Sequence, residues 1–285
     1  HLRIKPANWF DIRLAYTQSL SRPNYNHIIP SWNIGLNMVT WNNPNLKTSL
    51  SKNFDLYTSF YTNELGLLTV GGFYKEIKDL IFWSGIRAII DPNLYGLTKN
   101  ESGKTISTMV NNPYTAFVSG IELEWQTNFW FLPGLLKGIV LNTNYTRVFS
   151  TARYPRTEIK TTYLMQPPWV KTVNIDTFYV ARLIDQPNDI FNITVGYDYK
   201  DLSLRLSYLY QDDIFKRDNF YEKLRGNSIA YKRLDFTVKQ KLPIEGLDLF
   251  FNYNNILNAV ETDVVNGNGY PSREQYYLYT IDLGI

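Results

Sequence analysis

The chain has 285 residues, of which 44% are hydrophobic and 16% aromatic, with a formal net charge of +3 and no cysteine. This composition supports a folded core and excludes a disulfide framework, a thiolate metal site and a cysteine nucleophile. The small, dispersed charge does not favour a nucleic-acid partner, and no apolar run is long enough for a transmembrane helix. A membrane-spanning β-barrel stays open, because its strands are short and only every second residue is apolar.

Alternating apolar and polar residues recur along the chain and predict strands. In the first run, residues 9–19, the apolar side chains of Phe10, Ile12 and Leu14 alternate with charged or small ones. Nine more strands are expected at 52–62, 66–82, 120–129, 137–150, 191–199, 202–210, 233–240, 247–255 and 275–285. Which residues of 66–82 share a face is left open.

The connections between these strands alternate in length. Short turns are expected at 62–66, 130–138, 199–201 and 242–246, and long loops bearing Pro, Asn and Gly at about 20–50, 83–112, 151–188, 216–229 and 255–274. Outer-membrane barrels have short periplasmic turns and long extracellular loops, whereas a soluble β-sandwich has no reason to sort its connections. The pattern therefore predicts an all-β fold, an antiparallel transmembrane β-barrel.

Both ends of the chain fit this prediction. The opening residues 1–9 resemble the tail of an earlier descending strand followed by a short turn, so we expect the barrel to continue upstream of His1. In the last run, Tyr277, Tyr279 and Ile281 begin an apolar set that ends at Ile285. We expect this set to face lipid and the last strand to close onto the first strand of the barrel, because an open edge is not tolerated within a bilayer.

An ordered series of motifs resembles the C-terminal half of the barrel of TonB-dependent outer-membrane receptors. Residues 13–25, RLAYTQSLSRPNY, are similar to the family's strand that ends in a Ser-x-x-Arg-Pro sequence, and residues 43–61 begin with a similar Asn-Pro-x-Leu-Lys segment. Residues 71–82 and 250–259 resemble the following strand and the penultimate strand. Two features depart from the pattern: Thr48 and Ser49 replace a common Pro-Glu pair, and Ile285 replaces a terminal Phe.

The resemblance implies a barrel of about 22 strands with a plugged lumen, of which residues 1–285 would be the last ten strands. The plug domain and the segment that recruits the energy-coupling protein TonB would lie upstream. The whole protein would be an outer-membrane receptor of a Gram-negative bacterium for energised uptake of a scarce nutrient, such as a ferric chelate, cobalamin or an oligosaccharide. Its long loops would be extracellular and its C-terminus periplasmic.

The implied partners are outer-membrane lipid, TonB and the imported ligand, with a surface lipoprotein as a further partner that some importers use. Neither a cofactor nor an enzymatic activity is implied. His27 has no nearby cysteine or second histidine, and Glu122 and Glu124 lack the enclosed cleft of a glycosidase pair. The alternatives are another large outer-membrane barrel, such as a passive channel or adhesin, and a soluble secreted carbohydrate-binding β-protein.

Two sets of candidate site residues follow. Aromatic side chains in the long loops are candidates for ligand binding, because aromatic faces stack on sugars and apolar ligand groups: Trp32, Trp41, Trp83, Tyr95, Tyr163, Trp169, Tyr221 and Tyr270. Charged residues on the polar strand faces are candidates for plug contacts, with an internal ladder of ion pairs as the alternative: Asp11, Arg13, Glu122, Glu124, Arg205, Asp235 and Lys239. Residues 211–219 mix both charge signs and are interpreted as a solvated loop base.

Overall fold

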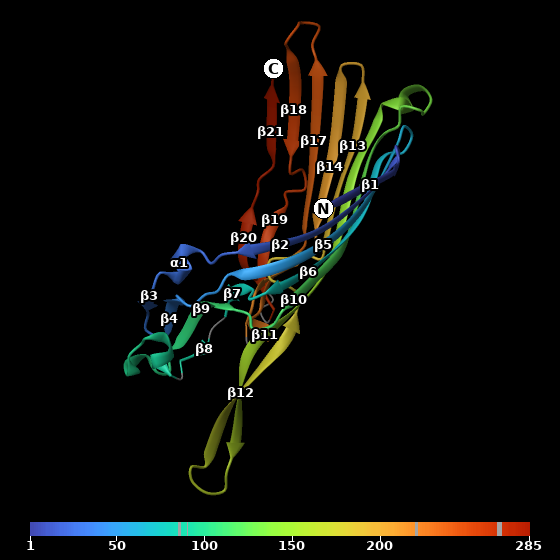
Figure 1. The fold of residues 1–285 in the computed structure, drawn as a ribbon. Helices are drawn as coiled ribbons and strands as arrows, with labels where there is room; N and C mark the ends of the chain where they lie inside the picture. Colours follow the sequence, from blue (N-terminus) through green and yellow to red (C-terminus); the bar gives the residue numbers. More distant parts are fainter. Residues whose placement is uncertain (85–86, 90, 220–221, 267–269) are drawn as a thin grey trace.

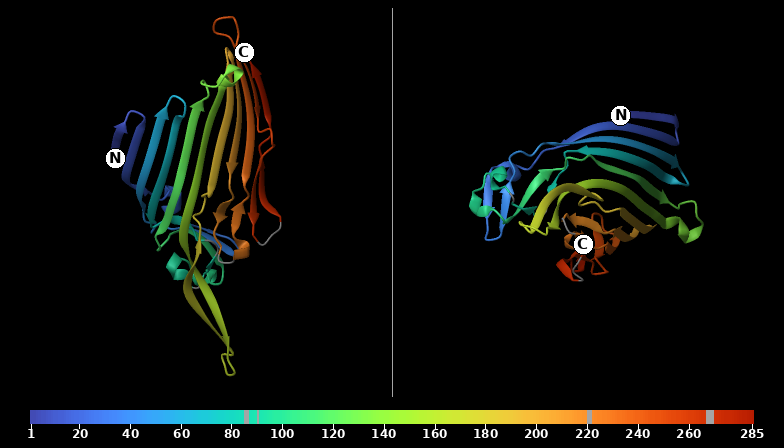
Figure 2. Two further views of the ribbon diagram at one scale, coloured as in Figure 1. Left: turned by 90° about the vertical axis from the view of Figure 1, so that its right-hand side faces the viewer. Right: turned by 90° about the horizontal axis from the view of Figure 1, so that it is seen from below.

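The computed structural model describes residues 1–84, 87–89, 91–219, 222–266 and 270–285. One curved sheet dominates the structure, and its arc is visible when the molecule is viewed along the strands (Figures 1 and 2). The strands follow one another in the order β1-β2-β5-β6-β10-β11-β13-β14-β17-β18-β21, and each pair of neighbours is antiparallel. The predicted all-β antiparallel meander is confirmed, with β1 and β21 at the two edges of the sheet.

The strands of this main sheet are β1 (Leu2–Ala7), β2 (Phe10–Ser21), β5 (Ser49–Thr62), β6 (Gly66–Lys78), β10 (Ala116–Asn128), β11 (Ile139–Tyr163), β13 (Asp189–Tyr199), β14 (Leu202–Gln211), β17 (Tyr231–Lys241), β18 (Asp248–Asn254) and β21 (Thr280–Gly284). The run expected at the start of the chain is β1, which turns directly into β2. The other ten strands lie where the alternation predicts them, except at three places. One is β11, which runs on to Tyr163 through residues that were predicted as a long loop, and the other two are as follows.

The first exception is the predicted strand 66–82. It breaks after Lys78, because Asp79 adopts a positive φ of 52°, and the chain continues as the separate strand β7 (Ile81–Trp83). The register also settles which residues of β6 share a face: Val70 and Tyr74 lie with Thr58 and Phe54 of β5.

The second exception is the predicted last strand, 275–285, which is too long. Its first residues belong to β20 (Pro271–Tyr276), which pairs with β19 (Val260–Val265) outside the main sheet. The backbone between β20 and β21 is held by loop side chains instead, since Asn255 Nδ2 donates to the carbonyl of Tyr277. Only the last residues join the main sheet, where Ile281 and Leu283 lie opposite Tyr253 and Phe251 of β18.

Connections of unlike length are sorted to opposite ends of the sheet, as predicted. Short turns, including the one that contains η3 (Gly134–Gly138), lie at one end, and the long connections gather at the other (Figures 1 and 2). The long connections are not irregular loops, because much of their backbone pairs into two small sheets. One contains β3 (Ser31–Ile34), β4 (Met38–Asn42), β7, β8 (Arg87–Ala88) and β9 (Thr105–Asn111), and the other β15 (Ile214–Arg217), β16 (Gly226–Ser228), β19 and β20.

Short helices and one long hairpin complete the loop end. The helices are α1 (Tyr25–Ile28), η1 (Pro92–Tyr95), η2 (Lys99–Glu101) and η4 (Glu222–Leu224). No helix within the described residues is both long and apolar enough to cross a membrane. Beyond the main sheet, β11 continues and pairs with β12 (Val170–Ala181) in a hairpin that projects away from the rest of the chain (Figure 1).

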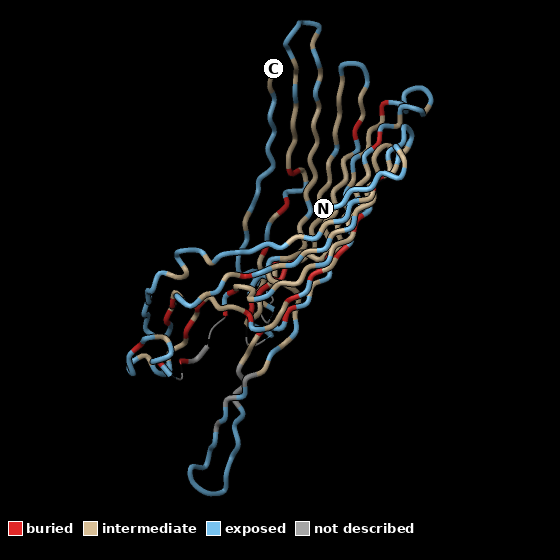
Figure 3. The backbone as a smooth tube through the Cα atoms, in the orientation of Figure 1, coloured by how far each residue is buried: buried red, intermediate tan, exposed pale blue. Residues whose placement is uncertain are grey.

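The main sheet has two unlike faces and no second layer over either. On one face Leu14 lies opposite Leu56 and Val195 opposite Leu206, while the other face carries Asp, Glu, Arg, Asn, Ser and Thr side chains. Exposed and intermediate positions dominate the strands (Figure 3). The chain exposes 18318 Å², whereas a compact soluble monomer of this size would expose about 12,600 Å². Both faces are therefore open in this chain, which is the expected state of a barrel wall between lipid and lumen.

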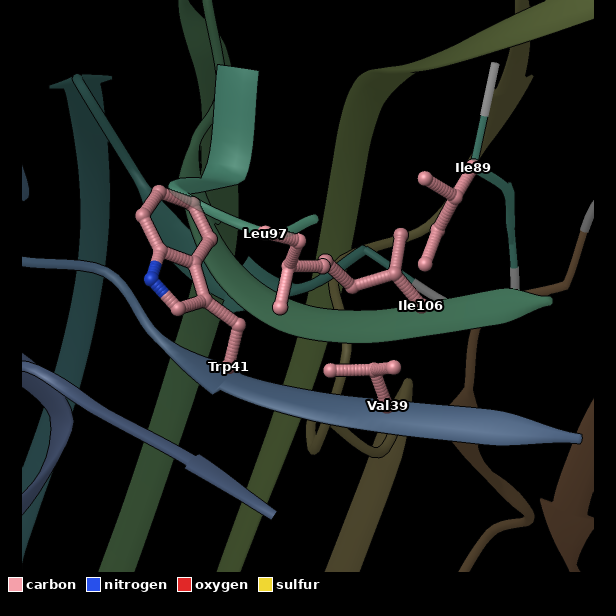
Figure 4. Close-up of a cluster of buried hydrophobic side chains, with 5 residues drawn as sticks. All are labelled: Val39, Trp41, Ile89, Leu97 and Ile106. Atoms are coloured by element: carbon pink, nitrogen blue, oxygen red, sulfur yellow. The ribbon is translucent and has the colours of Figure 1, made fainter. Parts of the chain in front are cut away.

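Two apolar clusters lie at the loop end rather than in the sheet. In the first, side chains of β4 and β9 and of the segment between β8 and η2 point toward one another: Val39, Trp41, Ile89, Leu97 and Ile106 (Figure 4). The second joins the main sheet to the loops and contains Phe82, Ala116, Ala152, Tyr154 and Phe215.

Tyr154 lies at the centre of the second cluster and is fully buried. Its ring centroid lies 5.2 Å from that of Phe82 and 5.9 Å from that of Phe215. Its hydroxyl donates to the carbonyl of Arg182 at 3.2 Å and accepts from the amide of Ile184 at 3.1 Å. Burial raises the pKa of the Tyr154 hydroxyl, which keeps it protonated and able to donate. One side chain thus ties three loop segments to the sheet.

We predict that Tyr154→Ala loosens the loops without unfolding the sheet. Removing a buried aromatic ring costs about 3–5 kcal/mol, so proteolytic cleavage within residues 182–218 should be at least about 100-fold faster than in the wild type. Tyr154→Phe keeps the ring and removes only the two hydrogen bonds, at a cost of about 1 kcal/mol each, so it serves as the matched control and should speed cleavage less than Tyr154→Ala. Equal cleavage rates for Tyr154→Ala and the wild type would refute the anchoring role.

Candidate ligand pocket and the polar face of the sheet

A pocket of about 760 Å³ opens at the loop end, between the two small sheets. Its volume lies in the range of sites that bind small molecules and cofactors. One wall comes from β4, β7 and β9, and the other from the segment that follows β12 and from β15. The lining residues are Met38, Thr40, Leu80, Ile81, Phe82, Trp83, Ser107, Met109, Leu183, Ile184, Asp185, Lys216, Arg217, Asp218, Asn219, Leu224 and Val265.

Backbone pairing sets the apolar wall of this pocket. Trp83 of β7 lies opposite Met109 of β9, and β4 runs parallel to β9, which brings Met38 to the same wall. Only 3 methionines occur in the chain, and two of them line this pocket. Because thioether side chains adapt to irregular shapes, such a wall suits a large apolar ligand surface.

The opposite wall carries charge on a fixed backbone. Ile184 is held by the Tyr154 hydroxyl at 3.1 Å, and the amide of Asp185 donates to the carbonyl of Phe215 at 2.9 Å. Lys216 Nζ lies 3.5 Å from a carboxylate oxygen of Asp185, and both side chains are largely exposed. Arg217 is also exposed and has no salt bridge to any carboxylate of the described residues. The pocket therefore combines an apolar wall with a charged lip, in which Lys216 and Arg217 lie near Asp185 and Asp218. Arg217 has no salt bridge to a described carboxylate and is the cation best placed to contact a negatively charged group of a ligand with an apolar body.

The aromatic residues that were expected to bind ligand lie in several different regions of the structure. Trp83 lines the pocket, 46% exposed, with the His27 ring 5.9 Å away. Trp41 lies in the first apolar cluster, and Trp32 donates from its indole nitrogen to the carbonyl of Tyr95 at 2.7 Å, so these three side chains pack the loop together.

The remaining aromatic candidates lie apart from the pocket. Tyr163 and Trp169 are near the tip of the projecting hairpin, 81% and 60% exposed, and Tyr270 is 78% exposed. Tyr221 lies outside the described residues. For all eight aromatic residues, contact with a ligand stays a prediction.

The interpretation of residues 211–219 as a solvated loop base is wrong. Ile214 and Phe215 are buried, at 7% and 4% exposure, and so is Asp218, at 5%. β15 packs these apolar side chains against the loops and turns Lys216 and Arg217 toward the pocket. The adjacent Ile and Phe within a charged run were the sequence signal for a buried strand.

The seven charged candidates for plug contacts all lie on the polar face of the sheet, and each has a partner within the sheet. Glu122 accepts from Tyr57 Oη at 2.6 Å, and Arg205 donates to Asp198 at 2.7 Å. The other pairs are Asp11 with Arg3 and Arg13, Arg13 with Tyr61, Glu124 with Gln126, Asp235 with Arg233 and the Asn255 amide, and Lys239 with Asp248. Among these seven residues, ion pairs between neighbouring strands are formed by Asp11 with Arg3, Arg205 with Asp198 and Lys239 with Asp248, so the internal ladder is present in part, and contact with a plug stays a prediction.

Large side chains on this face lie flat over glycines of the neighbouring strand. A Cβ atom on Gly71 would meet the Tyr57 ring at 2.2 Å, and a Cβ on Gly196 would meet the Arg205 side chain at 2.8 Å. The space above Gly71 is therefore what allows Tyr57 to reach Glu122. These large side chains therefore lie close to the backbone of the sheet, and the charged groups of the polar face form hydrogen bonds within the sheet. Within the described residues, no group of three or more His, Asp or Glu side chains is placed to hold a metal ion.

Residues 2–256 match the sequence profile of the family described as TonB dependent receptor-like, beta-barrel. The chain belongs to this family, whose members are outer-membrane transport receptors. No curated protein matches the chain.

Solved structures of the same fold extend over most of the chain. A mutant of the ferric enterobactin receptor PfeA from Pseudomonas aeruginosa is 15% identical, with a TM-score of 0.60 over 96% of this chain and 37% of that one. The siderophore receptor PirA from Acinetobacter baumannii is 15% identical, with a TM-score of 0.56 over 90% and 36%. A double mutant of the Serratia marcescens hemophore receptor HasR, in complex with its hemophore HasA and heme, is 14% identical, with a TM-score of 0.58 over 90% and 36%. The chain thus spans little more than a third of the length of these receptors.

We predict that Gly71→Ala destabilises the sheet and that Gly72→Ala does not. The first methyl group would displace the Tyr57 ring and its hydrogen bond to Glu122, a form of overpacking that costs about 1–3 kcal/mol. At Gly72 the nearest atom is the Gly120 carbonyl oxygen, in ordinary contact at 3.5 Å. The check is the urea midpoint of the full-length receptor, read from its heat-modifiable migration on a gel. Equal midpoints for the two variants would contradict the packing role of Gly71.

Proposed function

We propose that this chain forms the C-terminal part of the barrel of a receptor that imports an iron chelate across the outer membrane of a Gram-negative bacterium, with energy supplied through TonB. The observation that carries the proposal is the pocket at the loop end, which combines an apolar wall with Lys216 and Arg217. Ferric chelates and haem share an apolar or aromatic body with negatively charged groups, which this lining would accommodate. Family membership and the siderophore and hemophore receptors of the same fold support this class of cargo.

In the proposed orientation, the long connections and the pocket are extracellular, and the short turns and the C-terminus are periplasmic. The apolar face contacts lipid, and the polar face lines the lumen. Cargo then meets the pocket before it reaches the lumen. Cobalamin or an oligosaccharide as cargo, and a surface lipoprotein as partner, find no comparable support in the pocket chemistry.

The polar face would hold the plug domain of the whole receptor. The seven charged residues on this face have partners within the sheet, but most of them keep part of their side chain exposed. Their exposed carboxylates retain acceptor capacity, and their guanidinium and ammonium groups retain donor capacity, for a second partner. Weak, numerous polar contacts would hold a plug in place and still allow it to move.

We expect a thiol at position 124 to report this plug. The chain has no cysteine, so Glu124→Cys in a full-length receptor with no other accessible thiol can be labelled with a bulky, water-soluble maleimide. The thiol should be protected in the intact receptor and accessible after deletion of the plug. Leu123→Cys is the control on the opposite face and should stay protected in both. Equal labelling of Glu124→Cys with and without the plug would place the plug away from this face.

Uptake by cells tests the import function itself. Iron-starved cells with and without the receptor gene should differ in uptake of at least one radiolabelled compound from a panel of ferric catecholates, ferric hydroxamates, ferric carboxylates and haemin. The difference should vanish when the proton gradient is collapsed. Receptor-dependent ion conductance that needs no energy, together with unchanged uptake of the whole panel, would instead favour the passive channel.

Within that assay, the double variant Lys216→Glu, Arg217→Glu should lower the apparent affinity for the transported compound about 10- to 100-fold. Loss of a charge-assisted contact costs about 1.5–3 kcal/mol, and the introduced carboxylates repel an anionic cargo. Lys99→Glu is the matched control, since Lys99 is exposed on η2 and does not line the pocket. An unchanged affinity in the double variant would show that this pocket is not the ligand site.

A further inference from the structure

The turn between β10 and β11, residues 129–138, differs from other turns at the short-turn end of the sheet. Its sequence, FWFLPGLLKG, consists mainly of Phe, Trp and Leu and contains one charged residue, Lys137. The turns 63–65, 200–201 and 242–247 each contain an acidic residue, which this turn lacks. Exposed apolar side chains occur along the turn: Trp130 (55%), Phe131 (44%), Leu135 (67%) and Leu136 (51%). Apolar exposure concentrated in one segment indicates contact with a membrane or a partner rather than with water.

Ring contacts connect this turn to the apolar face of the sheet. Trp125 lies on that face of β10, where the strand register aligns it with Leu68 of β6 and, through Leu68, with Phe60 of β5. The ring centroid of Phe129 lies 6.4 Å from that of Trp125, and the centroid of Phe131 lies 6.1 Å from that of Phe129. The apolar surface of the sheet therefore continues into the turn, and the medium that covers this face also reaches the turn.

Side chains at the end of β10 cap the backbone of the neighbouring turn. Each carbonyl group of residues 63–65 accepts a hydrogen bond from one of three side chains: Trp125 Nε1 donates to Leu65 at 2.8 Å, Thr127 Oγ1 to Glu64 at 3.3 Å and Trp130 Nε1 to Asn63 at 2.9 Å. A turn in water does not need such caps, because water hydrates its carbonyl groups. Away from water an unpaired carbonyl group is costly, so the caps fit a place in the membrane.

Two charged side chains limit how deep this corner of the sheet can lie. Lys137 is near the end of the turn, Glu64 is in the middle of the neighbouring turn, and both are exposed. Neither charge could enter the hydrocarbon without losing its hydration, whereas a long side chain can extend from an apolar segment to the headgroups. The corner therefore fits the boundary between acyl chains and headgroups.

We propose that residues 129–138 form an interfacial anchor that inserts into the inner leaflet of the outer membrane. Continuity with the apolar face selects phospholipid acyl chains as the occupant, since Trp125, Phe129 and Phe131 form one surface. The aromatic belts of outer-membrane barrels consist of strand residues, whereas this anchor is a whole turn that includes the exposed leucines of η3. Only the choice of the inner leaflet rests on the orientation in the proposed function, and insertion itself does not depend on the cargo.

Fluorescence quenching by lipid tests this anchor. A full-length receptor with no other accessible thiol carries Leu135→Cys, is labelled with an environment-sensitive fluorophore and is reconstituted into phosphatidylcholine vesicles. In vesicles whose lipids are brominated near the headgroup end of the acyl chains, the label should lose at least about half of its fluorescence, because an interfacial segment lies about 5–10 Å deep. Aqueous iodide should quench this label only weakly.

The matched control places the label on another turn at the same end of the sheet. Asp201→Cys replaces an exposed residue of the turn 200–201, and its label should be quenched by iodide and only weakly by brominated lipid. If iodide quenches the label at position 135 as strongly as the label at position 201, the anchor does not exist. Equal quenching of both labels by brominated lipid would also overturn the proposal, because the whole short-turn end would then lie in the bilayer.

The exposed rings give a second readout. The double variant Trp130→Ser, Phe131→Ser should lower lipid quenching of the label at position 135 at least about 2-fold, because it removes apolar area that holds the turn in the boundary. Ile244→Ser, at an exposed apolar residue of the turn 242–247, should leave the quenching unchanged. Equal quenching in the double variant and the parent would contradict the anchoring role of the rings.

Folding and cargo are checked separately. Heat-modifiable migration confirms folding of each variant, and Phe131→Ser alone replaces the double variant if that variant does not fold, because it keeps the hydrogen bond from Trp130 to the Asn63 carbonyl. Uptake of iron chelates is measured in cells and lipid quenching in vesicles, so failure of the proposed cargo and failure of the anchor are distinguishable.

Discussion

The rest of the structure depends on the period of two along each strand. Successive side chains point to opposite faces, so a slip of one residue between neighbours would exchange the apolar and the polar sets. The register avoids this exchange from β1 to β21: Leu14 lies opposite Leu56, Leu206 opposite Phe236, and Phe251 opposite Leu283. A sheet with one apolar and one polar face, and no layer on either, gains its stability only when each face meets its own surroundings.

Side chains that lie over glycines help to hold this register on the polar face. Tyr57 can cover Gly71, and Phe250 can cover Gly284, only at one alignment of the strands. A slip would place a Cβ atom where a ring now lies. The glycines therefore work against misalignment, in addition to allowing the close approach of the hydrogen-bonded groups.

The strands were predictable from the sequence because alternation is a local signal, and it is strong where one face is apolar. Phe250 disturbs the alternation of β18 because it is an apolar residue on the polar face, where it lies over Gly284. The end of β6 could not be predicted, because the break depends on the backbone conformation of Asp79 and not on hydrophobicity. The pocket was not predictable, since it is formed by β4, β7, β9 and β15, which are short strands from connections far apart in sequence. The position of Lys216 and Arg217 at the pocket depends on the burial of Phe215 beside them, which was not predicted from the sequence.

Two strands of the pocket wall continue strands of the main sheet: β7 follows β6, and β9 leads into β10. β9 leads into β10 through Asn111 and Asn112, and both asparagines fix this junction: Asn111 Nδ2 donates to the Asp79 carbonyl at 2.9 Å, and Asn112 Nδ2 donates to the Arg153 carbonyl at 2.9 Å. The backbone amide of Asn112 donates to the Leu80 carbonyl at 2.7 Å. Because Asn112 is 1% exposed, these bonds are shielded from water and hold the pocket wall rigidly to the sheet. These hydrogen bonds therefore join the wall that carries Met109 and Trp83 to β10, the strand that presents Glu122 and Glu124 on the polar face.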